Sequence, residues 1–142
     1  MSYKITVIED NEPDVLLLEM ALERAGLSYT LTTLRDGAEA RNYFCSVAPD
    51  VPDLILMDMN LPKVDGMALL SLKDQCSSLA HVPVVVWSSV RSEQQIKKLE
   101  SFQVERFITK PASLEEFLLI GKLVRELIEQ VAAAPKGFGA SL

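Results

Sequence analysis

Residues 52–62 read Pro-Asp-Leu-Ile-Leu-Met-Asp-Met-Asn-Leu-Pro, an apolar run that ends at an aspartate, Asp58. A short run of this kind between two prolines is typical of a strand, because proline interrupts helices and a helix needs more residues. A strand that is apolar throughout belongs inside a parallel sheet, where both of its faces are covered. The carboxyl ends of such strands form the edge at which open α/β sheets bind their ligands. A buried carboxylate is costly without a partner or a function, so Asp58 is the first candidate for a functional residue.

Strand and helix patterns alternate along the whole chain. The five expected strands cover residues 5–8, 29–34, 54–58, 83–87 and 106–109. Each is followed by apolar residues at helical spacing, so the sequence predicts an α/β fold with a five-stranded parallel sheet, doubly wound with helices on both faces. We expect residues 1–131 to form this domain and residues 132–142, which contain proline and glycine, to form a flexible C-terminal tail.

The composition is that of a globular protein of one domain, with 142 residues, of which 49% are hydrophobic and 24% charged. There is no signal-peptide pattern and no apolar stretch of the roughly 20 residues needed to cross a bilayer, so we expect a cytoplasmic protein without a membrane partner. Cys45 and Cys76 lie in separate expected helices and are best interpreted as reduced thiols. The net charge of −6 argues against nucleic acid as a partner.

Polar side chains stand at the carboxyl ends of four expected strands. They are Glu9 and Asp10 after the first strand, Asp58 at the third, Ser88 after the fourth and Lys110 after the fifth. Because these ends meet along one edge of the sheet, the three carboxylates would repel one another unless a proton or a hard divalent cation binds there. Mg²⁺ fits best, since it takes oxygen ligands and keeps water molecules that a phosphate can replace.

This set of residues is suited to phosphoryl transfer. Asp58 would be the nucleophile, and Mg²⁺ held by Asp10 and Asp58 would neutralise charge. Lys110 would pair with the phosphoryl oxygens, and Ser88 would donate a hydrogen bond. Taken singly, each residue has a simpler explanation. Glu9 and Asp10 could cap a helix, whereas Lys110 and Ser88 could be ordinary surface groups.

Together, these residues resemble the signature of response-regulator receiver domains of two-component signalling. The matching residues, within about 3–130, are Glu9-Asp10, Asp58 with Asn60 and Pro62, Asp65-Gly66, Ser88 and Lys110-Pro111. The resemblance implies a flavodoxin-like sheet with strand order 2-1-3-4-5, and transfer of a phosphoryl group from a sensor histidine kinase to Asp58. It also implies that Asp10, Asp58 and the backbone carbonyl of Asn60 bind Mg²⁺. Glu9 would reach the metal mainly through water.

Within this family, the chain looks more like the stand-alone regulators linked to bacterial phytochromes. The similarity lies in the Glu9-Asp10-Asn11 start and in residues 33–37 and 107–110. It implies a bacteriophytochrome as the kinase. The family also implies a switch that couples a hydroxyl on the fourth strand to an aromatic residue on the fifth. Here these are Ser88, where threonine is common, and Phe107, which has no hydroxyl.

The last expected helix has an apolar arc wider than the roughly 100° stripe of a surface helix. One interpretation is a deeply buried helix. The other is that Leu119, Leu123 and Leu127 contact a second protomer, giving a homodimer, or a partner protein. Only about a dozen residues follow this helix, which leaves no room for an output module. Output is therefore expected to be a protein contact, with a downstream partner that the sequence does not identify.

Other classes of protein remain open. A degenerate receiver would act as an interaction module that never takes a phosphoryl group, although the intact acids and Lys110 argue against it. A phosphatase of the haloacid-dehalogenase type also uses an aspartyl nucleophile, but it needs a second acid where Asn60 stands. A flavodoxin-like electron carrier is disfavoured because the turn after the first strand is acidic and would repel a flavin phosphate. We expect a regulator that catalyses only its own phosphorylation and slow dephosphorylation, not an enzyme.

Overall fold

The computed structural model describes residues 2–46, 50–62, 64–90 and 92–133. Strands and helices alternate along them from the first element to the last. In chain order they are β1 (Tyr3–Ile8), α1 (Glu12–Arg24), β2 (Tyr29–Leu34), α2 (Gly37–Ser46), β3 (Leu54–Asp58), α3 (Gly66–Gln75), β4 (Val84–Ser88), α4 (Glu93–Leu99), β5 (Val104–Thr109) and α5 (Leu114–Ala133). The predicted βα alternation is confirmed.

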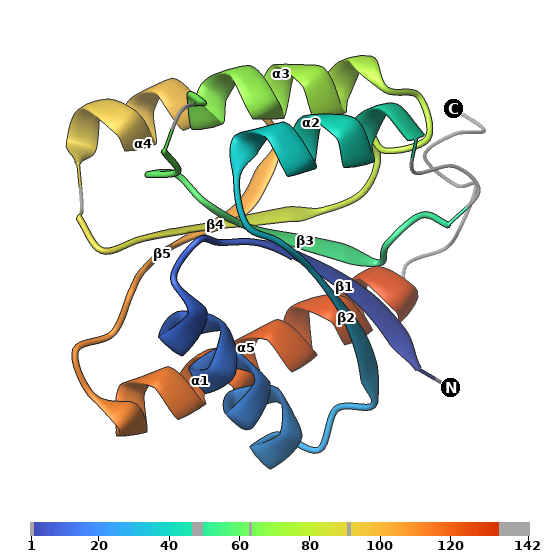
Figure 1. Ribbon diagram of the computed structural model, residues 1–142. Helices are drawn as coiled ribbons and strands as arrows, with labels where there is room; N and C mark the ends of the chain where they lie inside the picture. Colours follow the sequence, from blue (N-terminus) through green and yellow to red (C-terminus); the bar gives the residue numbers. More distant parts are fainter. Residues whose placement is uncertain (1, 47–49, 63, 91, 134–142) are drawn as a thin grey trace.

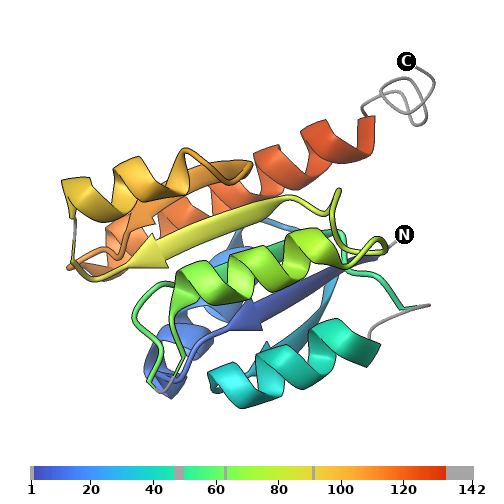
Figure 2. The ribbon, with the colours of Figure 1, turned by 90° about the horizontal axis from the view of Figure 1, so that it is seen from above.

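All five strands belong to one parallel sheet with the order β2-β1-β3-β4-β5. Helices α1 and α5 cover one face of the sheet, and α2, α3 and α4 cover the other (Figure 1). Seen from above, the arrows of β1 and β4 point the same way, with α3 lying over the sheet (Figure 2). The predicted doubly wound fold and its strand order are therefore both confirmed.

The central strands β3 and β4 are buried along their whole length, which explains why they contain almost only apolar residues. Their side chains alternate between two cores. Leu54 and Leu56 pack under α1 and α5, whereas Ile55 and Met57 pack under the other three helices. Trp87 of β4 is fully buried and meets Phe117 of α5 edge to face, with 5.8 Å between ring centroids.

The helix ends follow local signals in the sequence. The side chain of Asn11 caps α1 by accepting a hydrogen bond from the N–H of Asp14 at 3.1 Å. Gly26 follows the end of α1 with a φ of 77°, which glycine adopts without steric cost. Ser113 caps α5 by accepting from the N–H of Glu116 at 3.2 Å.

The last helix, expected to run to about residue 131, ends at Ala133. The domain boundary at residue 131 stays a prediction. The remainder of the expected tail, residues 134–142, lies outside the described residues. Within the part that is described, no helix combines the length and apolar character needed to cross a membrane.

Candidate functional site

The register of the sheet brings distant parts of the chain to one edge. Ile8 pairs with Met57, so Glu9 follows β1 beside the end of β3, where Asp58 lies. Ser88 pairs with Thr109, so Lys110 follows β5 beside the end of β4. The backbone N–H of Lys110 donates to the carbonyl of Ser88 at 2.8 Å and extends this pairing by one bond. The residues at the carboxyl ends of the strands therefore lie together at one edge of the sheet, as the sequence predicts.

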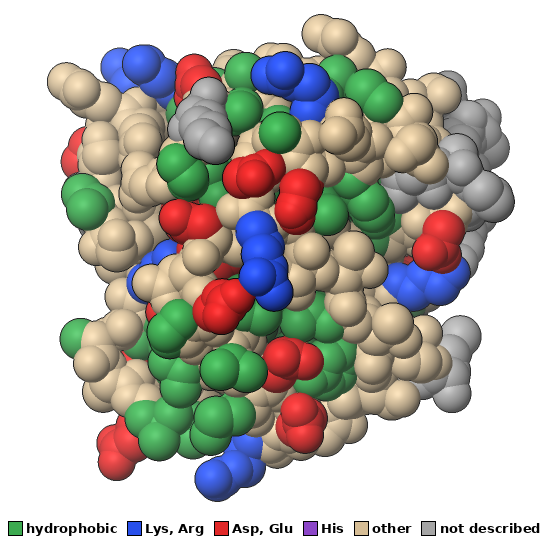
Figure 3. Space-filling view, viewed as in Figure 1, with side chains coloured by type: hydrophobic (Ala, Val, Ile, Leu, Met, Phe, Trp, Pro, Cys, Tyr) green, Lys and Arg blue, Asp and Glu red, His purple; other side chains and the backbone are tan. Residues whose placement is uncertain are grey.

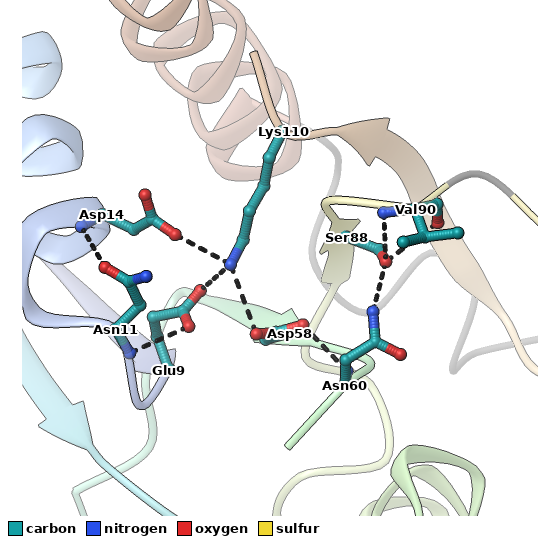
Figure 4. A network of polar contacts seen from close by, with 8 residues as sticks. All are labelled: Glu9, Asn11, Asp14, Asp58, Asn60, Ser88, Val90 and Lys110. Atoms are coloured by element: carbon teal, nitrogen blue, oxygen red, sulfur yellow. Dashed lines mark hydrogen bonds and ion pairs between the residues drawn. The ribbon is translucent and has the colours of Figure 1, made fainter. Parts of the chain in front are cut away.

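The ammonium group of Lys110 lies among three carboxylates (Figure 4). Its Nζ is 2.7 Å from Glu9 Oε1, 2.9 Å from Asp14 Oδ2 and 3.3 Å from Asp58 Oδ2. The side chains of Glu9 and Asp58 are only 0% and 6% exposed, and that of Lys110 only 11%. Charges that are withdrawn from water in this way interact much more strongly than exposed pairs.

The space-filling view shows the face of the molecule that is turned to the reader in Figure 1. Acidic side chains gather over its middle around a basic one, and hydrophobic side chains are exposed below them in the region of α1 (Figure 3). The exposed hydrophobic residues of α1 are Leu16 and Met20.

Asp58 is held on its other side by the loop that follows β3. The N–H of Asn60 donates to Asp58 Oδ1 at 2.8 Å, and the Asn60 side-chain amide donates to Ser88 Oγ at 2.6 Å. Ser88 Oγ also accepts from the N–H of Val90 at 3.2 Å and donates to the Val90 carbonyl at 2.9 Å. Figure 4 shows this chain of contacts running from Asp58 to the loop after β4.

The buried acid and base perturb each other's protonation. Burial is the main cause that raises the pKa of Glu9 to about 7, and the nearby Asp58 carboxylate adds to it, whereas Lys110 opposes the shift. Burial alone would lower the pKa of Lys110. The ion pairs with Glu9 and Asp14 outweigh that effect, so the pKa of Lys110 is raised and the side chain stays protonated.

The pKa of Glu9 predicts how stability depends on pH. The folded protein holds the Glu9 proton more tightly than the unfolded chain, whose glutamate has a pKa near 4.5. The free energy of unfolding should therefore lose a contribution as the pH rises from about 4.5 to about 7. Denaturant unfolding in the presence of a chelator, at about pH 5 and about pH 8, measures this loss. Glu9→Gln should not show this fall in the free energy of unfolding, whereas Glu12→Gln should show it as the wild type does. A constant difference between wild type and Glu9→Gln at both pH values would contradict the assignment.

The acidic cluster meets the geometric requirement of a cation site. One oxygen from each of Glu9, Asp10 and Asp58 can be chosen so that all three lie within 4.8 Å of one another. Glu9 Oε1 is buried, and its partner among the described residues is the Lys110 ammonium at 2.7 Å. Asp10 is exposed, which leaves the cluster open to solvent on one side. Carboxylate oxygens in this arrangement are consistent with divalent metal binding.

The two residues of the expected switch lie on the same face of the sheet. Phe107 pairs with Val86 in the ladder between β4 and β5, and it packs, half-buried, against the core under α2, α3 and α4. Ser88 is two residues beyond Val86, so its side chain points to that same face. Trp87 points to the opposite face, where the Lys110 ammonium lies 5.1 Å from its ring centroid.

Sequence reasoning missed two contacts of the site. Asp14 was not recognised as a partner of Lys110, and the amide of Asn60 was not connected to Ser88. Asp14 lies in the first turn of α1, and its contact with Lys110 depends on how that helix packs beside the end of β5. The Asn60 contact depends on how two loops approach each other, which no local pattern specifies.

The three leucines expected at an interface occupy different environments. Leu119 is 63% exposed. Leu123 is partly buried and packs against the core formed with α1 and the sheet. Leu127 is 7% exposed and belongs to that core, because its side chain faces the sheet. The prediction that Leu127 contacts a partner is therefore wrong, because its side chain is buried in the core.

Comparison with known proteins agrees with the fold. The sequence pattern of the family described as "Response regulator receiver domain" matches residues 5–120. The "Probable methanogenesis regulatory protein FilR2" of Methanothrix harundinacea is 33% identical over 115 residues, which cover 79% of this chain and 74% of that protein. "Response regulator Rcp1" of Synechocystis is 30% identical over 116 residues, covering 79% of each chain.

Two solved structures add to this similarity. The phosphorylated cyanobacterial phytochrome response regulator RcpA superposes with a TM-score of 0.85 at 34% identity, covering 96% of this chain and all of that one. The Mn²⁺-bound form of Rcp1 superposes with a TM-score of 0.78 at 28% identity, covering 87% of this chain and 92% of that one. The matching family model, these relatives and the shared fold show that the chain belongs to the response regulator receiver domain family.

Proposed function

We propose that this receiver domain accepts a phosphoryl group on Asp58 from a sensor histidine kinase, with Mg²⁺ bound in the acidic cluster. The observation that carries the proposal is the buried carboxylate of Asp58 at the open edge of the sheet, 3.3 Å from the Lys110 ammonium. A carboxylate kept there in a costly environment is well suited to act as a nucleophile. Receiver domains are signalling modules that take phosphoryl groups from histidine kinases, which agrees with this assignment.

The reaction is a displacement at phosphorus. A carboxylate oxygen of Asp58 forms a bond to the phosphorus of the kinase's phosphohistidine, and the phosphorus–nitrogen bond breaks with its electron pair returning to the imidazole. Lys110 stabilises the negative charge on the phosphoryl oxygens. The N–H of Asn60, which donates to Asp58 Oδ1, orients the carboxylate for attack. Mg²⁺, when bound, offsets the charge of the transferring group.

We assign the metal ligands to Asp10, Asp58 and the backbone carbonyl of Asn60, with Glu9 acting through water. The oxygen geometry of the acidic cluster supports this choice. The Mn²⁺-bound form of the similar protein Rcp1 supports a divalent cation in this family. Magnesium is the specific choice because it keeps water molecules that a phosphoryl oxygen can replace.

Ser88 connects the phosphoryl group to the rest of the molecule. Its hydroxyl hydrogen now goes to the Val90 carbonyl at 2.9 Å. To donate to a phosphoryl oxygen, Ser88 must give up that bond, which removes one of the contacts that hold the loop after β4. Phe107 lies on the same face of the sheet and packs against the adjoining core, so it is placed to repack when the loop moves. Phosphorylation would then shift the population between two loop positions.

The similarity to RcpA, a cyanobacterial phytochrome response regulator, supports a bacteriophytochrome as the kinase that phosphorylates this chain. Signalling onward is proposed to occur through a protein contact with a second copy of the chain or a downstream protein. A groove of about 550 Å³ on the outer side of α5 supports such a contact. Its lining residues are Arg24, Ala25, Leu118, Leu119, Lys122, Arg125, Glu126 and Glu129.

The charges along this groove favour a homodimer. Lys122 and Arg125 precede Glu126 and Glu129 along α5, so two copies of the helix packed antiparallel would place basic residues against acidic ones. Leu119, partly supported by Leu123, would supply the apolar centre of the contact. Such a self-complementary surface is what a two-fold interface requires.

We expect Leu119→Glu to shift the protein to monomer in sedimentation velocity, because it places a charge at the apolar centre of the contact. Leu16→Glu is the matched control. Leu16 of α1 is 61% exposed, close to the 63% of Leu119, but it does not line the groove. Equal masses for wild type and Leu119→Glu, with and without phosphorylation, would rule out this dimer.

The phosphoryl-transfer proposal is tested by mass spectrometry of the wild-type protein after incubation with acetyl phosphate and Mg²⁺. We expect one added phosphoryl group, located on the peptide that contains Asp58, and none when a chelator replaces Mg²⁺. The alternative function, an interaction module that works without phosphorylation, predicts an unchanged mass in both cases.

A further inference from the structure

Asp14 holds Lys110 from outside the acidic cluster. It lies in the first turn of α1, where its N–H is fixed by the Asn11 side chain. Its Oδ2 is 2.9 Å from Lys110 Nζ, and the Asp14 side chain is only 20% exposed. In Figure 4, Asp14 lies on the side of the ammonium group away from Asn60 and Ser88. This contact is therefore a well-shielded ion pair rather than a surface one.

The partners of Lys110 differ in what else they can bind. Glu9 and Asp58 belong to the acidic cluster that meets the geometry of a cation site, whereas Asp14 does not. When the cluster holds a divalent cation, the ammonium group competes with it for oxygens of Glu9 and Asp58. The two positive charges also repel each other in a partly desolvated site. Lys110 then needs a carboxylate that the cation does not use, and Asp14 is already in contact with it.

We propose that Asp14 is a positioning residue for Lys110, which keeps the ammonium group in place beside Asp58 when Mg²⁺ occupies the acidic cluster. This inference rests on the proposed function, because it assumes that Mg²⁺ binds there. In this arrangement Lys110 and Asp14 act as a pair. The Asp14 carboxylate offsets part of the electrostatic repulsion between the Lys110 ammonium and the metal ion. Without Asp14, Lys110 has only Glu9 and Asp58 among its ion-pair partners in the described structure, and cation binding must displace it from both.

Mg²⁺ affinity, measured by calorimetry on the unphosphorylated protein, tests this role without any reference to activity. Asp14→Asn should weaken Mg²⁺ binding on the order of tenfold, because a shielded charge next to the cluster is lost and Lys110 competes more strongly. Glu12→Gln is the matched control. It removes one charge from the same helical turn, but Glu12 pairs with Arg35 at 2.7 Å and both side chains are more than half exposed. Its effect should stay below about threefold, because exposed charges are screened.

Asp14→Asn and Glu12→Gln are each combined with Lys110→Met. The double variants distinguish an effect of Asp14 that acts through Lys110 from the loss of a negative charge. Lys110→Met removes the competing ammonium, so Asp14→Asn in that background should weaken Mg²⁺ binding clearly less than it does in the wild-type background. Two results would overturn the proposed role of Asp14 and leave the proposed metal site intact. One is that Asp14→Asn lowers the Mg²⁺ affinity no more than Glu12→Gln does in the wild-type background. The other is that the loss of affinity caused by Asp14→Asn is just as large in the Lys110→Met background. A wild-type protein that binds no Mg²⁺ would overturn the proposed metal site, and this inference with it. Circular dichroism of each variant verifies that it is folded.

Discussion

Asp58→Asn is expected to take up no phosphoryl group from acetyl phosphate, at any Mg²⁺ concentration that labels the wild type completely. An amide nitrogen or oxygen cannot replace the carboxylate as nucleophile at neutral pH. Asparagine also removes one of the acids of the cluster, so the exchange weakens cation binding at the same time. The side chain keeps its size, and Oδ1 can still accept the hydrogen bond from the N–H of Asn60. Loss of labelling would therefore report lost chemistry in a folded protein.

Asp65→Asn provides the matched control for this experiment. Asp65 follows Asp58 in the same loop and caps α3 by accepting from the N–H of Met67 at 3.0 Å. Asparagine caps helices as well as aspartate does, so this variant should be labelled like the wild type. Full labelling of Asp58→Asn, with the added mass on another peptide, would show that a different residue is the acceptor.

Gly121→Val is expected to lower the free energy of unfolding by at least about 3 kcal/mol. Gly121 is buried where α5 crosses α1, and a side-chain carbon at this position would overlap the carbonyl group of Ala21. Figure 1 shows the two helices packed together beneath the sheet. The overlap is with backbone atoms, which cannot rotate away, so α1 would have to move as a whole.

Helix propensity alone predicts that Gly121→Val raises the free energy of unfolding. Glycine is less favourable than valine inside a helix by a few tenths of a kcal/mol, so an exposed glycine would be improved by this exchange. Lys122→Val, at the exposed neighbouring position, should change stability by less than about 1 kcal/mol. Denaturant unfolding measures both variants. If Gly121→Val were as stable as the wild type, the close approach of α1 and α5 would not be required by the fold.

Much of the architecture could be predicted because its signals are local. The apolar run before Asp58 and the capping serine Ser113 depend on neighbours in the chain, so periodicity and caps were enough to place the elements within a few residues. The convergence of Glu9, Asp58 and Lys110 followed from a single rule, that the carboxyl ends of parallel strands share one edge. The strand order did not follow from periodicity and came from resemblance to a family.

The sequence by itself therefore determined the α/β class, the strands and the group of acidic and basic residues at their ends. Only the tertiary structure decided that Asp14 joins Lys110, that Asn60 reaches Ser88 and that Leu127 faces the core while Leu119 faces solvent. The reason is that these contacts depend on the direction in which α1 leaves β1, on the approach of two loops and on the rotation of α5 about its own axis. None of these quantities is encoded in the spacing of residues along one element. They are set by packing between elements that are distant in the chain.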